Sequence, residues 1–256
     1  MNYLNWIALY TLTRREIVRF FRIWSQTLLP SSVSMVLYFV IFGGLIGPRI
    51  GVIDGYRYIE YIAPGLIMMS VINNSFSNVV ASFFGTKFQR NIEEMYVAPM
   101  ASWVILLGFI SGGIARGCLV GLIVTIVALF FTKLHVHSVT VIFLVVLLTA
   151  MLFSLAGLIN AIFSKKFDDI SIIPTFILTP LTYLGGVFYS MHMLSPFWKK
   201  LSYLNPILYM VNAFRYGMLG VSDVPVQISL LFIGLCSVAL YFWTWYLLEK
   251  GTAMKN

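Results

Sequence analysis

Long apolar runs alternate with short polar breaks along the whole chain. A helix needs about 20 apolar residues to cross the hydrocarbon core of a bilayer. Six runs are long enough, and they cover residues 27–46, 58–83, 102–131, 138–163, 170–189 and 227–248. The pattern therefore predicts an all-α polytopic membrane protein, with six transmembrane helices in a single domain over residues 1–256.

The segment before the first run is amphipathic. A helical wheel over residues 6–26 separates an aromatic side from a polar side. The aromatic side holds Trp6, Tyr10, Ile17, Phe20, Phe21 and Trp24, and the polar side holds Thr11, Arg15, Arg19, Arg22 and Gln26. Such a helix typically lies in the membrane interface, with Arg15, Arg19 and Arg22 as anchors to lipid phosphates. The alternative is a cytoplasmic helix packed on the protein itself.

The break between the second and third runs has a similar pattern. Over residues 84–97, a wheel places Phe84, Phe88, Ile92 and Met95 on one face and Lys87, Arg90, Glu93 and Glu94 on the other. Arg90 is within reach of Glu93 at i+3 and of Glu94 at i+4. Pro99 should end the helix. The sequence predicts a short amphipathic helix parallel to the membrane, and a solvated loop is the alternative.

Residues 191–226 are too polar for a full span and too apolar for a free loop. Ser195-Pro196 and Asn205-Pro206 mark two turns. The short apolar stretches between them could dip back into the outer leaflet, where protein or a cavity must satisfy the backbone. A structured outer cap without a gating role is the alternative.

Composition agrees with a membrane protein, because 60% of the residues are hydrophobic and only 10% are charged. A water-soluble domain carries about 25% charged residues. The net charge of +8 comes from 17 Lys and Arg against 9 Asp and Glu. We assign this excess to loops on the negative side of a membrane and not to nucleic-acid binding.

Orientation follows from the placement of the basic residues. With the N-terminus inside, ten basic residues lie inside: Arg14, Arg15, Arg19, Arg22, Lys87, Arg90, Lys165, Lys166, Lys250 and Lys255. Six lie outside: Arg49, Arg57, Lys133, Lys199, Lys200 and Arg215. This bias predicts that both termini are cytoplasmic.

Several polar residues interrupt the predicted spans. Arg116 stands alone in the third run, where it is either functional or, as we prefer, paired with neighbouring groups. Gly113, Gly117 and Gly121 form a stripe beside it that would let another helix approach closely. The other candidates for lining a pathway or packing between helices are Asn73, Asn74, Asn160 and Tyr183.

The chain shows no motif for chemistry of its own. None of its acidic residues falls near the middle of a predicted span, although proton-coupled carriers commonly use membrane-embedded carboxylates. It contains neither the phosphate-binding G-x-x-x-x-G-K-[ST] pattern nor a metal-binding H-E-x-x-H pattern. We therefore expect no catalytic, cofactor or metal site, and energy supplied by another subunit. A secondary carrier or channel without an ATPase is the alternative.

Three stretches carry a resemblance to a known family: "FQRNIEEMYVAPM", "FSKKFDDISIIPTFILTPLTYLGGVFYS" and "LNPILYMVNAFRYGMLG". Their order and spacing resemble the membrane subunit of type-2 ABC exporters, in particular the YadH-like inner-membrane permeases. The resemblance covers essentially the whole chain. It implies a homodimer of six-span subunits in the inner (plasma) membrane, with two ATPase subunits docked on the cytoplasmic side. ATP and Mg would bind to those partners.

The same resemblance assigns roles to the polar segments. It implies that residues 6–26 form the interfacial helix and that residues 84–97 form the coupling helix that touches the ATPase. It also implies that residues 191–226 form short re-entrant helices that close the outer exit. The implied contact and boundary residues of the coupling helix are Arg90, Glu93, Glu94, Met95 and Pro99.

Overall fold

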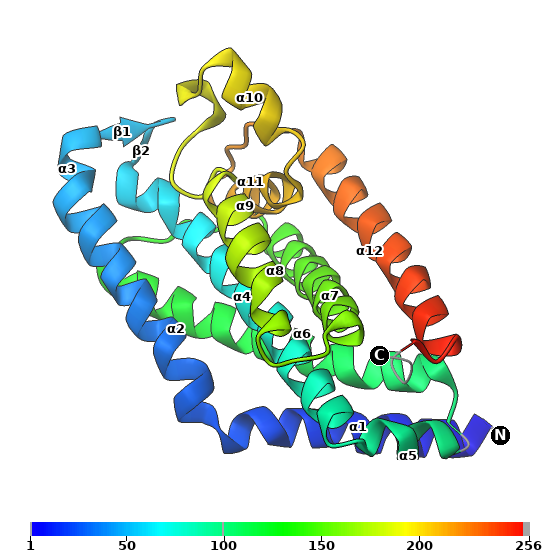
Figure 1. Ribbon diagram of the computed structural model, residues 1–256. Helices are drawn as coiled ribbons and strands as arrows, with labels where there is room; N and C mark the ends of the chain where they lie inside the picture. Colours follow the sequence, from blue (N-terminus) through cyan, green and yellow to red (C-terminus); the bar gives the residue numbers. More distant parts are fainter. Residues whose placement is uncertain (1, 99, 253–256) are drawn as a thin grey trace.

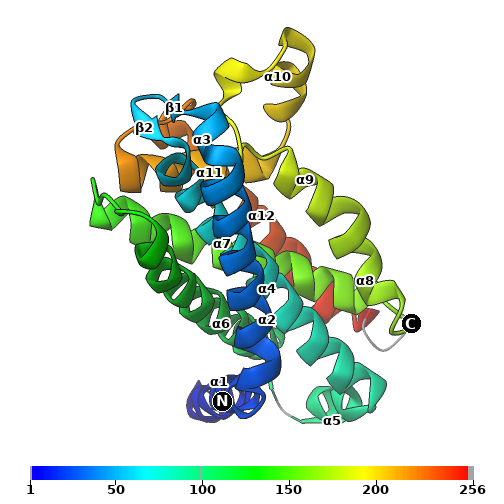
Figure 2. The ribbon, with the colours of Figure 1, turned by 90° about the vertical axis from the view of Figure 1, so that its left-hand side faces the viewer.

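A bundle of long helices stands on one helix that lies across its end (Figure 1). The computed structural model describes residues 2–98 and 100–252. Helix α1 (Asn2–Arg22) lies across the bottom of Figure 1, and α5 (Asn91–Val97) lies at the same end. The short elements α3, β1, β2 and α10 gather at the opposite end, an arrangement also visible in Figure 2. The two ends of the bundle are therefore built from different kinds of element.

Five helices in the described part of the chain are long and apolar enough to cross a membrane. The first, Trp24–Ile50, joins α2 (Trp24–Tyr38), the π-helical stretch η1 (Phe39–Ile46) and α3 (Gly47–Ile50). The others are α4 (Tyr58–Phe88), α6 (Ser102–Phe131), α7 (Val139–Phe163) and α12 (Val226–Glu249). They coincide with five of the six predicted runs.

The remaining predicted run, residues 170–189, forms a shorter helix than expected. It consists of α8 (Asp169–Ile173), the π-helical η2 (Pro174–Leu178) and α9 (Thr179–Tyr183). At 1.5 Å per residue this helix is about 22 Å long, less than the ~30 Å of a hydrocarbon core. The helix stops because Gly186 adopts a φ of +72° and turns the chain. The apolar residues from Leu184 onward therefore belong to a loop.

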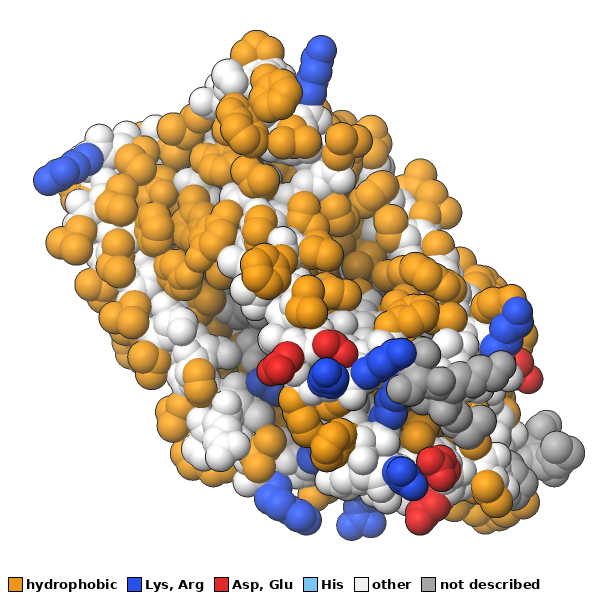
Figure 3. Space-filling view, viewed as in Figure 1, with side chains coloured by type: hydrophobic (Ala, Val, Ile, Leu, Met, Phe, Trp, Pro, Cys, Tyr) orange, Lys and Arg blue, Asp and Glu red, His pale blue; other side chains and the backbone are white. Residues whose placement is uncertain are grey.

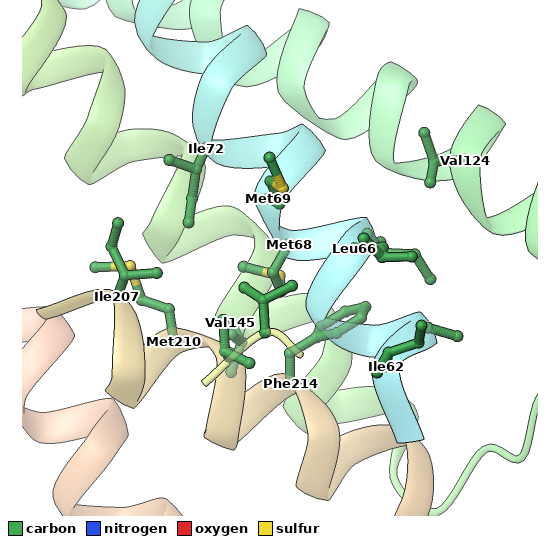
Figure 4. Packing of buried hydrophobic residues seen from close by; sticks show 14 of the residues in the cluster. Ile62, Leu66, Met68, Met69, Ile72, Val124, Val145, Ile207, Met210 and Phe214 are labelled. Carbon is green, nitrogen blue, oxygen red and sulfur yellow. The ribbon is translucent and has the colours of Figure 1, made fainter. Parts of the chain in front are cut away.

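Helix α4 is the centre of the bundle. In its most apolar window 83% of the residues are buried, against 11% in Trp24–Ile50 and 17% in α12. It packs against α6, α7 and α11 (Pro206–Leu219). Figure 4 shows Ile62, Leu66 and Ile72 of α4 among side chains from α6, α7 and α11. Most residues in the apolar windows of Trp24–Ile50, α6 and α12 are not buried, which suits contact with lipid or another subunit.

The glycine stripe of α6 faces the protein interior. A Cβ at Gly117 would collide with the hydroxyl of Ser75, and one at Gly121 would lie 2.8 Å from a methyl group of Val71. Both neighbours belong to α4. A Cβ at Gly113 would meet Ser154 of α7. The stripe therefore lets α6 approach both helices closely, as the sequence predicted.

The N-terminal amphipathic helix has different limits from those predicted. Instead of covering residues 6–26, α1 ends at Arg22, and Trp24 already begins α2. The wheel also placed Phe20 on the lipid face, but only 1% of this residue is exposed, whereas 51% of Phe21 is. The chain leaves the helical conformation at Ile23, so one wheel cannot describe Trp24 and Gln26 together with α1.

The predicted helix over residues 84–97 is divided into two parts. Helix α4 continues to Phe88, and α5 begins only at Asn91. Between them Arg90 has the left-handed φ of 61°, which ends the first helix. As a result Phe88 points outward with 60% exposure and does not share a face with Ile92, which is 2% exposed.

The end of the bundle opposite α1 contains the only strands in the described residues. Strands β1 (Val52–Ile53) and β2 (Tyr56–Arg57) pair antiparallel around Asp54 and Gly55, both at positive φ. This hairpin is a small departure from the predicted all-α class. Residues 191–226 contain η3 (Met191–Met193), α10 (Pro196–Ser202) and α11, so short helices occur where short apolar stretches were expected.

The close packing of α6 on α4 can be tested by a pair of glycine substitutions. Gly117→Leu should lower the thermal unfolding temperature of the purified protein, because the added side chain overlaps Ser75 and overpacking costs about 1–3 kcal/mol. Gly234→Leu on α12 is the matched control, since a Cβ there meets no atom within 4 Å. Equal stability of the two variants would show that the stripe does not hold α4 and α6 together.

Candidate functional site

A buried carboxylate joins α1 to the bundle. Glu16 is 0% exposed, and its oxygens lie 3.1 Å from Nη2 of Arg15 and 3.3 Å from Nε of Arg19. The hydroxyl of Ser82 on α4 donates a further hydrogen bond to Glu16. Gly112 of α6 leaves room for this side chain, because a Cβ there would lie 2.7 Å from Cβ of Glu16. Glu16 lies outside the six apolar runs, and its burial is created by α4 and α6, so the sequence pattern does not indicate it.

Arg19 extends this contact along α4. Its Nη2 donates to Oδ1 of Asn78 at 3.0 Å and to the Asn78 carbonyl at 3.2 Å. The prediction that Arg15, Arg19 and Arg22 all point to lipid phosphates therefore needs correction for two of them. Arg15 and Arg19 compensate the buried charge of Glu16. Arg22 is exposed, and the ion pairs among the described residues include none from it.

Arg116 lies in a second polar cluster beside the first. Its Nη2 donates to Oδ1 of Asn74 at 3.0 Å and approaches the Thr27 carbonyl at 3.4 Å. The amide of Asn74 in turn donates to Ser31 of α2 at 3.0 Å. These contacts tie α6, α4 and α2 together within the membrane. The geometry matches the structural alternative for Arg116, in which neighbouring groups pair with it.

A polar groove of about 270 Å³ runs between α2 and α4. Asn73 lies in it half-buried, and its amide donates to the Met69 carbonyl of its own helix at 2.9 Å. At the rim, the hydroxyls of Tyr38 and Tyr183 lie 3.1 Å apart and bridge α2 to α9. The groove is lined by Pro30, Ser31, Ser34, Met35, Tyr38, Met69, Ser70, Asn73 and Asn74. Two of the predicted pathway candidates, Asn73 and Asn74, therefore line the groove, and a third, Tyr183, contacts its lining residue Tyr38.

The face that carries this groove is mainly hydrophobic (Figure 3). The rings of Tyr38 in α2, Phe42 in η1, Phe188 in the loop after α9 and Tyr183 in α9 stack or tilt against one another. Charged side chains appear mainly near the α1 and α5 end and at the opposite rim. A large aromatic face with a small polar groove suits either a second subunit or an amphipathic ligand.

Asn160 lies away from the groove. It is 4% exposed, and its amide donates to the Ile170 carbonyl at 3.1 Å, which joins the end of α7 to α8. Nearby, Oδ2 of Asp169 accepts hydrogen bonds from the backbone N–H groups of Lys165 and Lys166, at 2.9 and 3.0 Å. The turn is therefore a fixed connection between two helices.

Helix α5 presents a charged side to solvent and an apolar side to the protein. Ile92 is buried, Met95 is half-buried, and Glu93 and Glu94 are exposed. The hydroxyl of Tyr96 donates to the Leu248 carbonyl of α12 at 3.0 Å. Burial, followed by the charge of Glu249, raises the pKa of Tyr96 to about 12. The helix is thus held on one face and open on the other.

The structure does not support the predicted ion pairs of Arg90, and it does not describe Pro99. Within residues 2–98 and 100–252 no ion pair joins Arg90 to Glu93 or Glu94. The left-handed backbone at Arg90 removes the continuous helix on which that spacing rule depends. Pro99 lies outside the described residues.

The end of the bundle opposite α1 contains a buried arginine, Arg215, although its position between two predicted spans suggested an exposed charge. Arg215 of α11 is 1% exposed and lies over the ring of Tyr61 at 4.0 Å. Its Nη2 donates to the Gly186 carbonyl at 2.6 Å, and its Nη1 lies 4.0 Å from Asp223. Asp223 also accepts a hydrogen bond from Ser190 at 2.9 Å. The cluster connects α4, α11 and the loops after α9 and before α12.

Comparison with known proteins identifies the family of this chain. The family model for the ABC-2 type transporter matches residues 7–219. The chain belongs to the ABC-2 type transporter family. It is 54% identical over its full length to the inner membrane transport permease YadH of Escherichia coli K12, which it also covers completely. It is 24% identical to nodulation protein J of Neorhizobium galegae over 89% of this chain and 87% of that protein.

The match to the ABC-2 type transporter family assigns the protein to a class of membrane transporters. The matched region begins within α1 and ends with α11, so it includes both polar clusters, the groove, α5 and Arg215. The chain is thus a multi-pass membrane protein of a transporter family, as the sequence resemblance predicted.

The buried carboxylate gives a prediction about stability. Glu16→Gln keeps the size of the side chain but leaves Arg15 and Arg19 without their counter-charge. Because both arginines are partly exposed, we expect a loss of about 1–3 kcal/mol and faster hydrogen exchange in α1. Glu93→Gln, which removes an exposed carboxylate, is the control. If both variants unfold at the parent's temperature and α1 stays equally protected, Glu16 does not hold α1 in place.

Proposed function

We propose that this chain is the membrane-spanning subunit of an ATP-driven exporter. In this proposal it works as a homodimer in the inner membrane, and two separate ATPase subunits bind ATP and Mg. It has no catalytic site of its own and does not bind nucleic acid. The observation that carries the proposal is α5, a short helix held by the bundle on one side and open on its acidic side. Membership of the ABC-2 type transporter family supports it.

The attachment of α5 suits the transfer of force. The buried Ile92 and the bond from Tyr96 to Leu248 hold it against the bundle and α12. Only Gln89 and Arg90 separate it from α4, the central helix. A displacement imposed on Glu93 and Glu94 would therefore reach both α4 and α12. The proposed coupling contacts are Arg90, Glu93, Glu94 and Met95, with Pro99 following them.

We assign the end with α1 and α5 to the cytoplasm, and with it both termini. The short turn with Lys165 and Lys166 and the exposed Arg14 and Arg22 support this orientation, because basic residues concentrate on the cytoplasmic side. The inner-membrane location rests on the name of the 54% identical permease. In this orientation α1 lies at the inner surface, where Arg22 and the exposed Trp6 and Tyr10 face lipid headgroups.

The face with α2 and α9 is the proposed site of the pathway and of the second copy. Asn73 and Asn74 supply polar groups to the groove, and Tyr183 closes its rim. Arg116 and Asn160 serve packing. We assign the sixth span to Asp169–Tyr183, which local thinning of the bilayer would accommodate. The proposed re-entrant closure is α10 with the almost wholly buried α11.

The coupling assignment can be tested by reversing the charge of α5. Glu93→Lys combined with Glu94→Lys leaves Ile92 and Tyr96 unchanged, and exposed charges contribute only about 0–1 kcal/mol to stability. The variant should insert and dimerise normally but lose co-purification of its ATPase, because like or unpaired charges would meet at the contact. Membrane yield, oligomeric state and ATPase recovery are the measurements.

The control reverses two charges at the opposite end, through Lys199→Glu and Lys200→Glu on α10. It should leave ATPase recovery at the parent's level. Normal recovery of ATPase and normal substrate-stimulated hydrolysis in the α5 variant would show that α5 is a solvated turn and not the coupling element.

A further inference from the structure

A groove of about 730 Å³ lies where α1 crosses the end of α4. Its lining reaches Gln89 and Asn91, at the start of α5. Four arginines line it and only one acid does. The lining is Thr11, Arg14, Arg15, Glu16, Val18, Arg19, Arg22, Ile23, Ala81, Ser82, Gly85, Thr86, Gln89 and Asn91. This excess of positive charge in one groove favours the binding of an anion.

The internal contacts leave this surplus largely intact. Glu16 is fully buried and already engaged by Arg15, Arg19 and Ser82. Arg14 and Arg22 are exposed, and neither takes part in an ion pair or hydrogen bond described for residues 2–98 and 100–252. At least two guanidinium groups are therefore available to a ligand.

We propose that this groove binds the phosphate of an anionic phospholipid headgroup from the cytoplasmic leaflet. Arginine forks match the geometry of phosphate oxygens and form strong charge-assisted hydrogen bonds with them. The amides of Gln89 and Asn91 line the same groove and supply further donors.

A lipid fits the groove better than a free phosphate ion. Val18 and Ile23 line it and are 44% and 37% exposed, so apolar surface adjoins the arginines. Just beyond it, Phe21 and Trp24 are 51% and 56% exposed. Aromatic residues of this kind sit at the level of lipid headgroups. A glycerol backbone and acyl chains would cover these side chains, whereas a free ion would leave them in water.

Because the groove adjoins α5, a lipid bound in it would influence the position of the proposed coupling helix. Its far wall is the turn with Gln89 and Asn91, which leads from α4 into α5. A headgroup bound there would brace α1 against the start of the proposed coupling helix. This consequence rests on the proposed function, whereas the binding itself does not.

The binding can be measured on the purified chain in uncharged detergent, without any ATPase. The probes are short-chain phosphatidylglycerol, short-chain phosphatidylcholine and inorganic phosphate. The parent should bind phosphatidylglycerol more tightly than either of the others. Arg14→Gln combined with Arg22→Gln should weaken that binding roughly thirtyfold. The matched control, Lys165→Gln with Lys166→Gln, removes two positive charges from the same end without touching the groove and should bind as the parent does.

Three results would overturn the proposal. Equal weakening in the groove variant and the control would mean that only general surface charge attracts the lipid. Inorganic phosphate binding as tightly as phosphatidylglycerol would assign the groove to a soluble anion. Unchanged lipid binding together with lost ATPase recovery in the groove variant would make it a protein contact. The coupling test measures ATPase recovery in the α5 variant, whereas this test measures lipid binding to the purified chain. The proposed function and the lipid site can therefore be refuted independently.

Discussion

The arrangement of the helices depends on one constraint. The buried polar side chains of the central helix α4 need hydrogen-bond partners from neighbouring helices. Helix α4 carries Asn74, Asn78 and Ser82 on its length, and all three are buried. An unpaired polar group in such surroundings is costly, because no water is available to replace its partner. Arg116, Arg19 and Glu16 supply partners for Oδ1 of Asn74, Oδ1 of Asn78 and the hydroxyl of Ser82, whereas Nδ2 of Asn78 has no partner among the described residues. The requirement therefore fixes where α1 and α6 must lie, and α1 becomes part of the bundle as well as a surface helix.

The same helix connects the two ends of the molecule. Its first turns carry Tyr61, whose ring and carbonyl contact Arg215 of the outer cluster. Its last turns carry Ser82 and lead through Arg90 into α5. Tight packing against the glycines of α6 and the residues of α7 leaves α4 little freedom to bend independently. A rigid central helix in contact with both ends would transmit a displacement of α5 to the residues around Arg215.

Much of the fold could be predicted from the sequence, because apolar length and glycine spacing are local signals. Five of the six runs, the close-packing role of Gly117 and the orientation of Ile92 and Glu93 on α5 were predictable. The end of α9 depends on the positive φ of Gly186, and the break before α5 depends on that of Arg90, neither of which periodicity reveals. Glu16 and Arg215 were missed for another reason. Their burial is created by distant helices, α4 and α6 in one case and the loops near Gly186 and Asp223 in the other.

The central claim is that the cytoplasmic end of this chain, through α5, receives force from an ATPase. Photocrosslinking in intact membranes tests it most directly, with the crosslinking residue placed at Glu94 on α5 or at Lys199 on α10. The account predicts a covalent adduct between the chain and an ATP-hydrolysing protein from position 94 and none from position 199. Absence of that adduct at position 94, or an ATPase adduct from position 199, would contradict it.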